Sequence, residues 1–230
     1  MAMTHDIAGA MGRVRERVGR ACERAGRDSA SVQLIAVSKG HPEAAIRAAY
    51  EAGMRVFGEN YAQELATKAS ALGDLPDLRW RFIGHLQRNK IKIIERARAT
   101  VDTVDSVRLA QAISVRAAAR AMDVDVLIQV NVSGEAQKSG CTPDGVPQLV
   151  EAVRALPGVT LRGLMTVAPH LEDVEATRPF FASLRTLAEA NGLSELSMGM
   201  THDLEQAVAE GATMIRIGTA IFGPRSPATR

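Results

Sequence analysis

Lysine is scarce in this sequence, with five residues against 23 arginines, so each lysine can be weighed as a nucleophile. Lys39 comes two residues after the apolar run Val32 to Val37. If that run is a strand, burial of the lysine stem disfavours the ammonium form. It would lower the pKa below about 10.4 and expose the lone pair that Schiff-base chemistry requires. A solvated lysine at the end of a strand is the alternative interpretation.

Two glycine-threonine segments near the C-terminus suggest a second kind of chemistry. The segments are MGMTHD, with Gly199 and Thr201, and RIGTAIFG, with Gly218 and Thr219. Glycines permit close backbone approach, threonines offer hydroxyls, and a helix from about Asp203 would point its N-terminal amides at the same place, a combination that suits a phosphate. Thr201 as a helix N-cap is an alternative that is compatible with phosphate binding.

Several other polar residues follow apolar runs and are weaker candidates. Asn60 is the best of them, because it follows the FGE segment at the end of a predicted strand. His41 and His85 fit a structural role equally well, and Lys138 is a second amine whose default interpretation is a solvated loop lysine. The other polar groups expected near the ends of strands are Glu59, Asp105, Asn131, Ser133 and Thr166.

The elements that would position these groups alternate in type along the chain. An amphipathic helix opens the sequence within residues 1–27, because Ile7, Met11, Val14 and Val18 recur at helical spacing. Eight short apolar runs follow, at 32–37, 55–57, 80–83, 100–104, 124–132, 160–165, 195–198 and 214–217. Helical stretches separate them at 43–52, 61–72, 89–98, 107–122, 144–156, 172–191 and 203–211.

Eight strands alternating with helices predict an α/β fold, a single (β/α)₈ barrel over residues 1–230. The runner-up, an open doubly wound sheet, expects a glycine-rich fingerprint after its first strand, and VSKGHPE lacks one. In a barrel, the residues just past each strand converge on one mouth, which would bring the amine and the phosphate loops together. The sequence runs only seven residues beyond Gly223, so we expect one domain.

Composition narrows the classes of partner. The chain is 46% hydrophobic and 3% aromatic, which predicts an aliphatic core, and its net charge of +2 comes from scattered residues that suit no polyanion such as nucleic acid. Cys22 and Cys141 have no metal-ligand spacing, so no metal is expected. No stretch approaches the roughly 18 apolar residues of a membrane span, and Glu16 and Glu23 argue against a transit peptide. We expect a cytosolic protein.

The motifs now assembled resemble the pyridoxal phosphate homeostasis protein family, also described as proline synthase co-transcribed proteins. The resemblance runs in order through nearly the whole chain after the first helix. Its segments are AVSKGHP around Lys39, FGENYAQEL, WRFIGHLQRNK, VDS, QVNVSGEAQKSG, LRGLMTVAP, LSMGMTHDLEQAVAEGAT and MIRIGTAIFGPR.

The resemblance implies the barrel of fold-type III pyridoxal phosphate (PLP) enzymes, as in alanine racemase, with the cofactor aldehyde on Lys39. Arg216 then falls where the family places a group on the pyridine nitrogen. Because Arg can only donate, that nitrogen must stay an unprotonated acceptor, which weakens the ring as an electron sink. An outward Arg216 that pairs with a helix carboxylate is the alternative. Asn60 would stand beside the ring.

Three residues depart from the family pattern. Thr201 stands where Ser is usual and keeps the hydroxyl. His202 stands where an acidic residue is common, and Arg81 replaces a frequent His. We expect no direct cofactor contact from His202 or Arg81.

Three functions remain open at this stage. The family implies a PLP-binding carrier or regulator in cofactor homeostasis without catalytic residues, serving PLP-dependent apoenzymes and expected as a monomer. An amino-acid racemase needs a second base on the opposite face of the substrate, and the only tyrosines are Tyr50, in a predicted helix, and Tyr61, expected to pack near the mouth. A scaffold that has lost its cofactor is disfavoured by Lys39, Arg216 and Thr219. Lys138 is a second amine that could meet a free aldehyde and so form a second PLP site.

Overall fold

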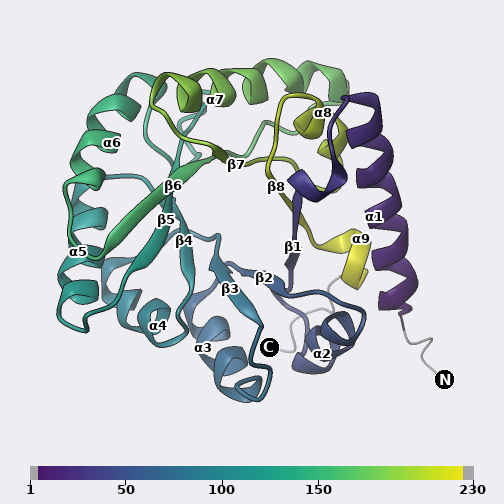
Figure 1. The fold of residues 1–230 in the computed structure, drawn as a ribbon, viewed down its shortest axis with the longest axis horizontal. Coiled ribbons are helices and arrows are strands. Elements are labelled where there is room, and N and C mark those ends of the chain that lie inside the picture. The colour runs from purple at the N-terminus through teal and green to yellow at the C-terminus, as the bar shows by residue number, and fades with distance from the viewer. Residues whose placement is uncertain (1–4, 225–230) are drawn as a thin grey trace.

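Eight parallel strands close into a barrel in which each strand pairs with its neighbours along the chain, and β8 pairs with β1 (Figure 1). The computed structural model describes residues 5–224. The predicted (β/α)₈ barrel is therefore confirmed. The strands are β1 (Gln33–Val37), β2 (Val56–Glu59), β3 (Arg79–Phe82), β4 (Thr100–Val104), β5 (Val124–Gln129), β6 (Val159–Met165), β7 (Glu195–Ser197) and β8 (Met214–Ile217).

Helices surround the barrel, and the opening helix packs against the last two (Figure 1). Asp6 caps this first helix by accepting a hydrogen bond from the Gly9 amide. The helices are α1 (Ile7–Arg24), α2 (Glu43–Glu51), α3 (Ala62–Ala71), α4 (Ile91–Arg96), α5 (Val107–Ala118), α6 (Val146–Arg154), α7 (Arg178–Ala190), α8 (Leu204–Ala209) and α9 (Thr219–Phe222). Short 3₁₀ turns lie at Ser29–Ser31, Arg88–Lys90, Pro143–Gly145 and Val174–Thr177.

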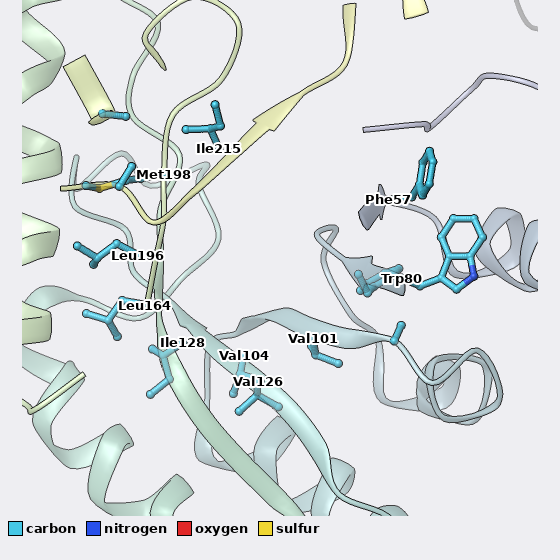
Figure 2. Packing of buried hydrophobic residues seen from close by; sticks show 14 of the residues in the cluster. Phe57, Trp80, Val101, Val104, Val126, Ile128, Leu164, Leu196, Met198 and Ile215 are labelled. Carbon is cyan, nitrogen blue, oxygen red and sulfur yellow. The ribbon is translucent and has the colours of Figure 1, made fainter. Parts of the chain in front are cut away.

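Strand residues alternate between two packing layers, as the pleat requires. One buried cluster lies inside the barrel and contains Ile35, Val56, Leu127, Met165 and Met214. Their neighbours along the strands belong to the larger cluster between barrel and helices. In Figure 2, Ile128, Leu164 and Leu196, from three adjacent strands, point toward the helices. Both layers are mostly aliphatic, as predicted.

The barrel interior also holds charge, which the expectation of an aliphatic core omitted. Arg81 lies between the outward-facing Trp80 and Phe82, and its Nε donates to both carboxylate oxygens of Asp102 at 3.0 and 2.9 Å. Arg216 occupies another interior position, on β8. A buried arginine and aspartate are tolerated because they pair with each other.

Some predicted boundaries were wrong by one turn or more. β5 ends at Gln129 rather than 132, because the chain then turns into a loop in which Val130 makes one isolated bridge to Cys141. The helix predicted over 89–98 begins as a 3₁₀ turn, and α5 stops at Ala118 before Ala121, which has a positive φ of 49°. α9 was not predicted, since four residues give no periodicity.

Candidate functional site

Lys39 lies at the mouth of the barrel, two residues beyond the end of β1. Its strand is buried from Ile35 onward, and Lys39 itself is half-buried, followed by the exposed Gly40. Gly40 has a φ of 72°, a left-handed conformation that glycine adopts without strain. The chain therefore turns directly after the lysine, which keeps it at the end of the barrel where the active sites of such folds lie.

A buried polar network lies under this turn. Lys68, on α3, donates from Nζ to the Ser38 carbonyl oxygen at 2.7 Å, to Glu59 Oε1 at 2.7 Å and to Glu64 Oε1 at 2.6 Å. Ser38 Oγ also donates to Glu59 Oε1, and the Gly40 amide donates to Glu64 Oε1. Ser38 is thus tied to α3 and β2, and Gly40 is tied to α3.

Arg216 is buried inside the barrel, with 4% of its surface exposed. Its Nη1 donates to Ser197 Oγ at 2.8 Å, and its Nη2 donates to the Thr166 carbonyl oxygen at 2.7 Å. These partners lie at the ends of β7 and β6, so the guanidinium faces the mouth. The alternative of an outward Arg216 is wrong. Burial lowers the pKa of Arg216, while the charge of Asp102 raises it. The guanidinium remains a cation, because arginine is not deprotonated in proteins.

The loop after β7 carries two of the predicted phosphate residues. Gly199 is buried with a φ of 90°, and a Cβ there would lie 2.4 Å from the Ala207 side chain. This glycine therefore lets α8 pack against the strand. Thr201 is half-buried in the following turn. It is not the N-cap of α8: Asp203 is, and its carboxylate accepts from the Met200 amide at 2.7 Å.

The loop after β8 runs straight into α9. Gly218 is the N-cap residue of this helix, and a Cβ there would come within 3.2 Å of the Val37 carbonyl oxygen on β1. Thr219 is the first helical residue and is exposed. The first amides of a helix have no acceptor within it, so those of α9 are available to an anion.

Asn60 follows β2 and packs against the backbone of the next strand's loop. A Cβ on Gly84 would lie 2.0 Å from the Asn60 carbonyl oxygen, so glycine is required there. The Asn60 side chain has a buried Oδ1 without a hydrogen-bond partner. A cavity of about 320 Å³ opens beside it, lined also by Tyr61 and His85. Tyr61 lies near the mouth as expected, but it is 62% exposed, so it does not pack there.

Other candidate residues from the sequence make contacts within their own loops or with neighbouring loops and helices. Asn131 accepts from Ser133 Oγ and the Gly134 amide, and so shapes the turn after β5. Lys138 pairs with Glu135 at 3.1 Å and donates to the Val167 carbonyl oxygen at 3.4 Å. His41 stacks on Phe222 with ring centroids 5.0 Å apart.

His85 and His202 both contact groups from neighbouring loops. His85 lies 3.8 Å from Asp105. The His202 ring lies 4.9 Å from that of His170, which joins the loops after β6 and β7.

Lys68 and Glu64 are residues that the sequence analysis passed over. A signal was present: Lys68 lies on the same face of its helix as Leu65 and Leu72, both buried, at spacings of three and four residues. A lysine on an apolar face must find a buried partner. Glu59 is that buried partner, and the partly exposed Glu64, four residues before Lys68, is a second one.

A cavity of about 330 Å³ opens at the opposite end of the barrel, among the first residues of the strands. Arg79, Arg81, Arg162, Asp125 and Glu195 contribute charges of both signs. Residues at this end of such barrels usually serve stability. Lys39 and the glycine-threonine loops all lie at the other end.

The residues at the mouth fit the donor set that PLP requires. An amine suits the aldehyde, a buried cation with unused N–H groups suits an acceptor nitrogen, and hydroxyls with helix amides suit a phosphate. The buried Asn60 Oδ1 without a partner marks a polar position that a ligand could complete.

Within residues 5–224, no helix has the length and apolar character needed to cross a membrane, and no three His, Cys, Asp or Glu side chains come together as metal ligands. Cys22 is buried in α1, and burial raises the pKa of Cys141 to about 11.

Residues 11–226 match the family described as alanine racemase, N-terminal domain. A pyridoxal phosphate homeostasis protein from Pseudomonas aeruginosa is 49% identical over 221 residues, spanning 95% of this chain and 96% of the relative. A protein of the same name from Aquifex aeolicus is 46% identical over 221 residues, spanning 94% and 96%.

Solved structures agree with these relatives. A protein from Bifidobacterium adolescentis has a TM-score of 0.90 at 39% identity, covering 95% of both chains. PipY of Synechococcus elongatus, solved with PLP bound, has a TM-score of 0.83 at 38% identity, covering 94% of this chain and 100% of PipY. Alanine racemase from Clostridium difficile, at 13% identity and a TM-score of 0.68, shares the fold, and this chain covers 57% of it.

Proposed function

Because the chain belongs to the pyridoxal phosphate homeostasis protein family, we propose that it binds PLP and acts in PLP homeostasis as a carrier or regulator. The observation that carries the proposal is the meeting of three groups at one end of the barrel. They are the amine of Lys39, the inward guanidinium of Arg216, and the glycine-threonine loops after β7 and β8.

Lys39 is proposed to attach the cofactor. Its amine would condense with the aldehyde, forming a carbon–nitrogen double bond and releasing the aldehyde oxygen as water. The amine must be unprotonated to attack the aldehyde carbon. When bound in this way, PLP can act as an electron sink.

Arg216 is proposed to face the pyridine nitrogen. Its donors to Ser197 and the Thr166 carbonyl fix the guanidinium plane, and the remaining N–H groups can donate to a ring acceptor. A nitrogen that accepts from a cation is not protonated, so the ring withdraws electrons weakly. This supports holding the cofactor more than turning over a substrate.

The phosphate is proposed to lie between the loops after β7 and β8. Thr201 and Thr219 would supply hydroxyls, and the first amides of α9, after Gly218, would supply backbone donors. Gly199 contributes by bringing α8 close. Asn60 is proposed to stand beside the ring.

We propose further that the protein is a cytosolic monomer and that PLP-dependent apoenzymes receive the cofactor from it. Amino-acid racemisation is the second candidate function. It is favoured by one observation, the position of Tyr61 at the cavity beside Asn60. Tyr50 cannot serve, because its hydroxyl donates to Asp77, which lies just before β3 begins and therefore at the end of the barrel opposite to the mouth.

The absorption spectrum of the purified protein tests the proposal. Incubation with PLP should give a visible band, and borohydride reduction followed by peptide mapping should place the cofactor on Lys39. Lys39→Ala should abolish the band. A full band in this variant, with the label on Lys138, would show that another lysine holds the cofactor.

A further inference from the structure

Lys68 is a buried lysine in a chain that has five. Its side chain is 5% exposed, and its ammonium has three donors that are all used at 2.6 to 2.7 Å. An aliphatic side chain at this position would bury apolar surface without the cost of desolvating a charge. The contacts of Lys68 therefore suggest a role beyond filling space.

These contacts converge on the segment that carries Lys39. The residue before it, Ser38, is held through its carbonyl by Lys68 and through its hydroxyl by Glu59. The residue after it, Gly40, is held through its amide by Glu64. Since Lys68 binds both carboxylates, one ammonium fixes the backbone on each side of Lys39.

The network also sets the charge beneath Lys39. Glu59 and Glu64 bring two carboxylates, and Lys68 neutralises one of them. Burial raises the pKa of Glu59, while hydrogen bonds from Lys68 and Ser38 lower it, and its Oε2 is buried without a hydrogen-bond partner. Without Lys68, this carboxylate pair would stabilise a positive charge on any nearby amine.

We propose that Lys68 is a positioning residue for the attachment of PLP to Lys39. It holds the turn from Ser38 to Gly40 so that the Lys39 amine meets the aldehyde, and it offsets carboxylate charge that would keep that amine protonated. Attachment needs the unprotonated amine, whose nitrogen bonds to the aldehyde carbon as the oxygen leaves in water. This inference rests on the proposed function.

The first test uses protein without cofactor. Lys39 acetylation by acetic anhydride is followed by peptide mass spectrometry across a range of pH, in wild type and in Lys68→Met. The midpoint of reactivity should rise by about one pH unit in Lys68→Met, because a compensating positive charge is lost. The control is Lys92→Met, an exposed lysine of α4, which should match wild type.

A double variant separates the effect of Lys68 on the position of Lys39 from its effect on the charge near Lys39. Lys68→Met with Glu59→Gln removes the buried ion pair as a unit, so the net charge of the network stays that of wild type. The acetylation midpoint should return to the wild-type value. If Lys68→Met does not fold, a single Glu59→Gln variant tests the charge term in the opposite direction, with a midpoint below wild type.

The second test measures affinity for PLP and for pyridoxal by the visible band. The affinity of the double variant should be about tenfold lower for both ligands. The reason is that the hydrogen bond from Lys68 to the Ser38 carbonyl is missing, and both ligands carry the aldehyde that reacts with Lys39.

A purely structural role for Lys68 predicts a different pattern. The variants would then unfold at lower temperature, yet below that temperature their midpoints and affinities would equal wild type, which would overturn the proposal. If wild type itself fails to bind PLP at Lys39, the proposed function fails, while the acetylation midpoints still report on Lys68.

Discussion

Thr201 and Thr219 differ in exposure although the sequence presents them alike. Thr201 is half-buried in a turn, and its carbonyl oxygen accepts a hydrogen bond from Arg17. Thr219 is exposed at the start of α9. A half-buried hydroxyl in a fixed turn loses little entropy on binding an anion. An exposed one at a helix start acts together with the amides beside it.

Removal of either hydroxyl should weaken the binding of PLP without preventing it. A hydrogen bond to a charged group contributes about 1.5 to 3 kcal/mol, so Thr201→Val or Thr219→Val should each reduce affinity about ten- to a hundredfold. Pyridoxal, which lacks the phosphate, should bind nearly as before. The measurement is a pair of affinities on wild type and both variants; equal losses for the two ligands would mean that these threonines shape the barrel.

The residues of the candidate site were largely predictable because strand ends in a barrel share one mouth. Lys39 and Gly218 needed only the strand positions, whereas Arg216 was expected from the resemblance to the family, because the residues alone left its orientation open. Lys68 was missed because its role depends on a helix face meeting a loop from another strand. That contact joins residues 30 positions apart, so the local signal, a lysine on an apolar helix face, indicates burial without indicating the partner.

At the scale of elements, α1 reaches the loop after β7 through Arg17. Its guanidinium donates to both oxygens of Glu205 on α8, at 2.5 and 2.7 Å, and to the Thr201 carbonyl oxygen at 2.8 Å. The opening helix therefore braces the turn that carries Thr201. Burial alone would raise the pKa of Glu205, but hydrogen bonding and charge from Arg17 lower it below 4.5.

Loss of this brace should weaken phosphate binding indirectly. Arg17→Ala should reduce PLP affinity about fivefold, since a partly exposed ion pair contributes about 1 kcal/mol, and it should leave pyridoxal affinity unchanged. Arg20→Ala, which removes an exposed pair with Glu16 on the same helix, is the matched control. Equal affinities in all three proteins would show that α1 does not hold the turn.

The stability that Arg17 contributes should depend on pH with a definite sign. Because the pKa of Glu205 is lowered in the folded state, the contribution is complete above about pH 4.5 and is lost as the pH falls through the lowered value. Urea unfolding of wild type and Arg17→Ala should therefore differ at neutral pH and converge below pH 4.5. A constant difference across this range would contradict the assignment of the pair.

The order and type of the elements followed from the sequence because each strand is a short apolar run and each helix has its own periodicity. The residues at which helices and strands end were less predictable. β5 reads as apolar through Val132, yet hydrogen bonding to β6 ends near Val130 where the chain turns toward Cys141. Such ends are fixed by partners distant in sequence, so local pattern alone places them only to within a few residues.

At the scale of the whole molecule, the barrel is shared with larger proteins. This chain covers 57% of Clostridium difficile alanine racemase and 63% of a D-threonine aldolase from Filomicrobium marinum, at 13% and 17% identity. The relatives named for pyridoxal phosphate homeostasis are instead spanned almost completely. A racemase requires two bases on opposite faces of the substrate carbon, and the mouth of this barrel offers Lys39 for one of them.

The loaded protein should therefore show no racemisation near the usual enzyme rate of about 10 s⁻¹. Tyr61 is the tyrosine at the mouth, but it is 62% exposed, and no hydrogen bond within residues 5–224 orients its hydroxyl. A base that is not held in place cannot return a proton to one face selectively. The measurement is the appearance of D-alanine from L-alanine, and of the opposite isomer for other amino acids, in wild type, Lys39→Ala and Tyr61→Phe. Rapid racemisation by wild type that is lost in Lys39→Ala and also in Tyr61→Phe would establish Tyr61 as the second base. The protein would then be an enzyme and not a carrier.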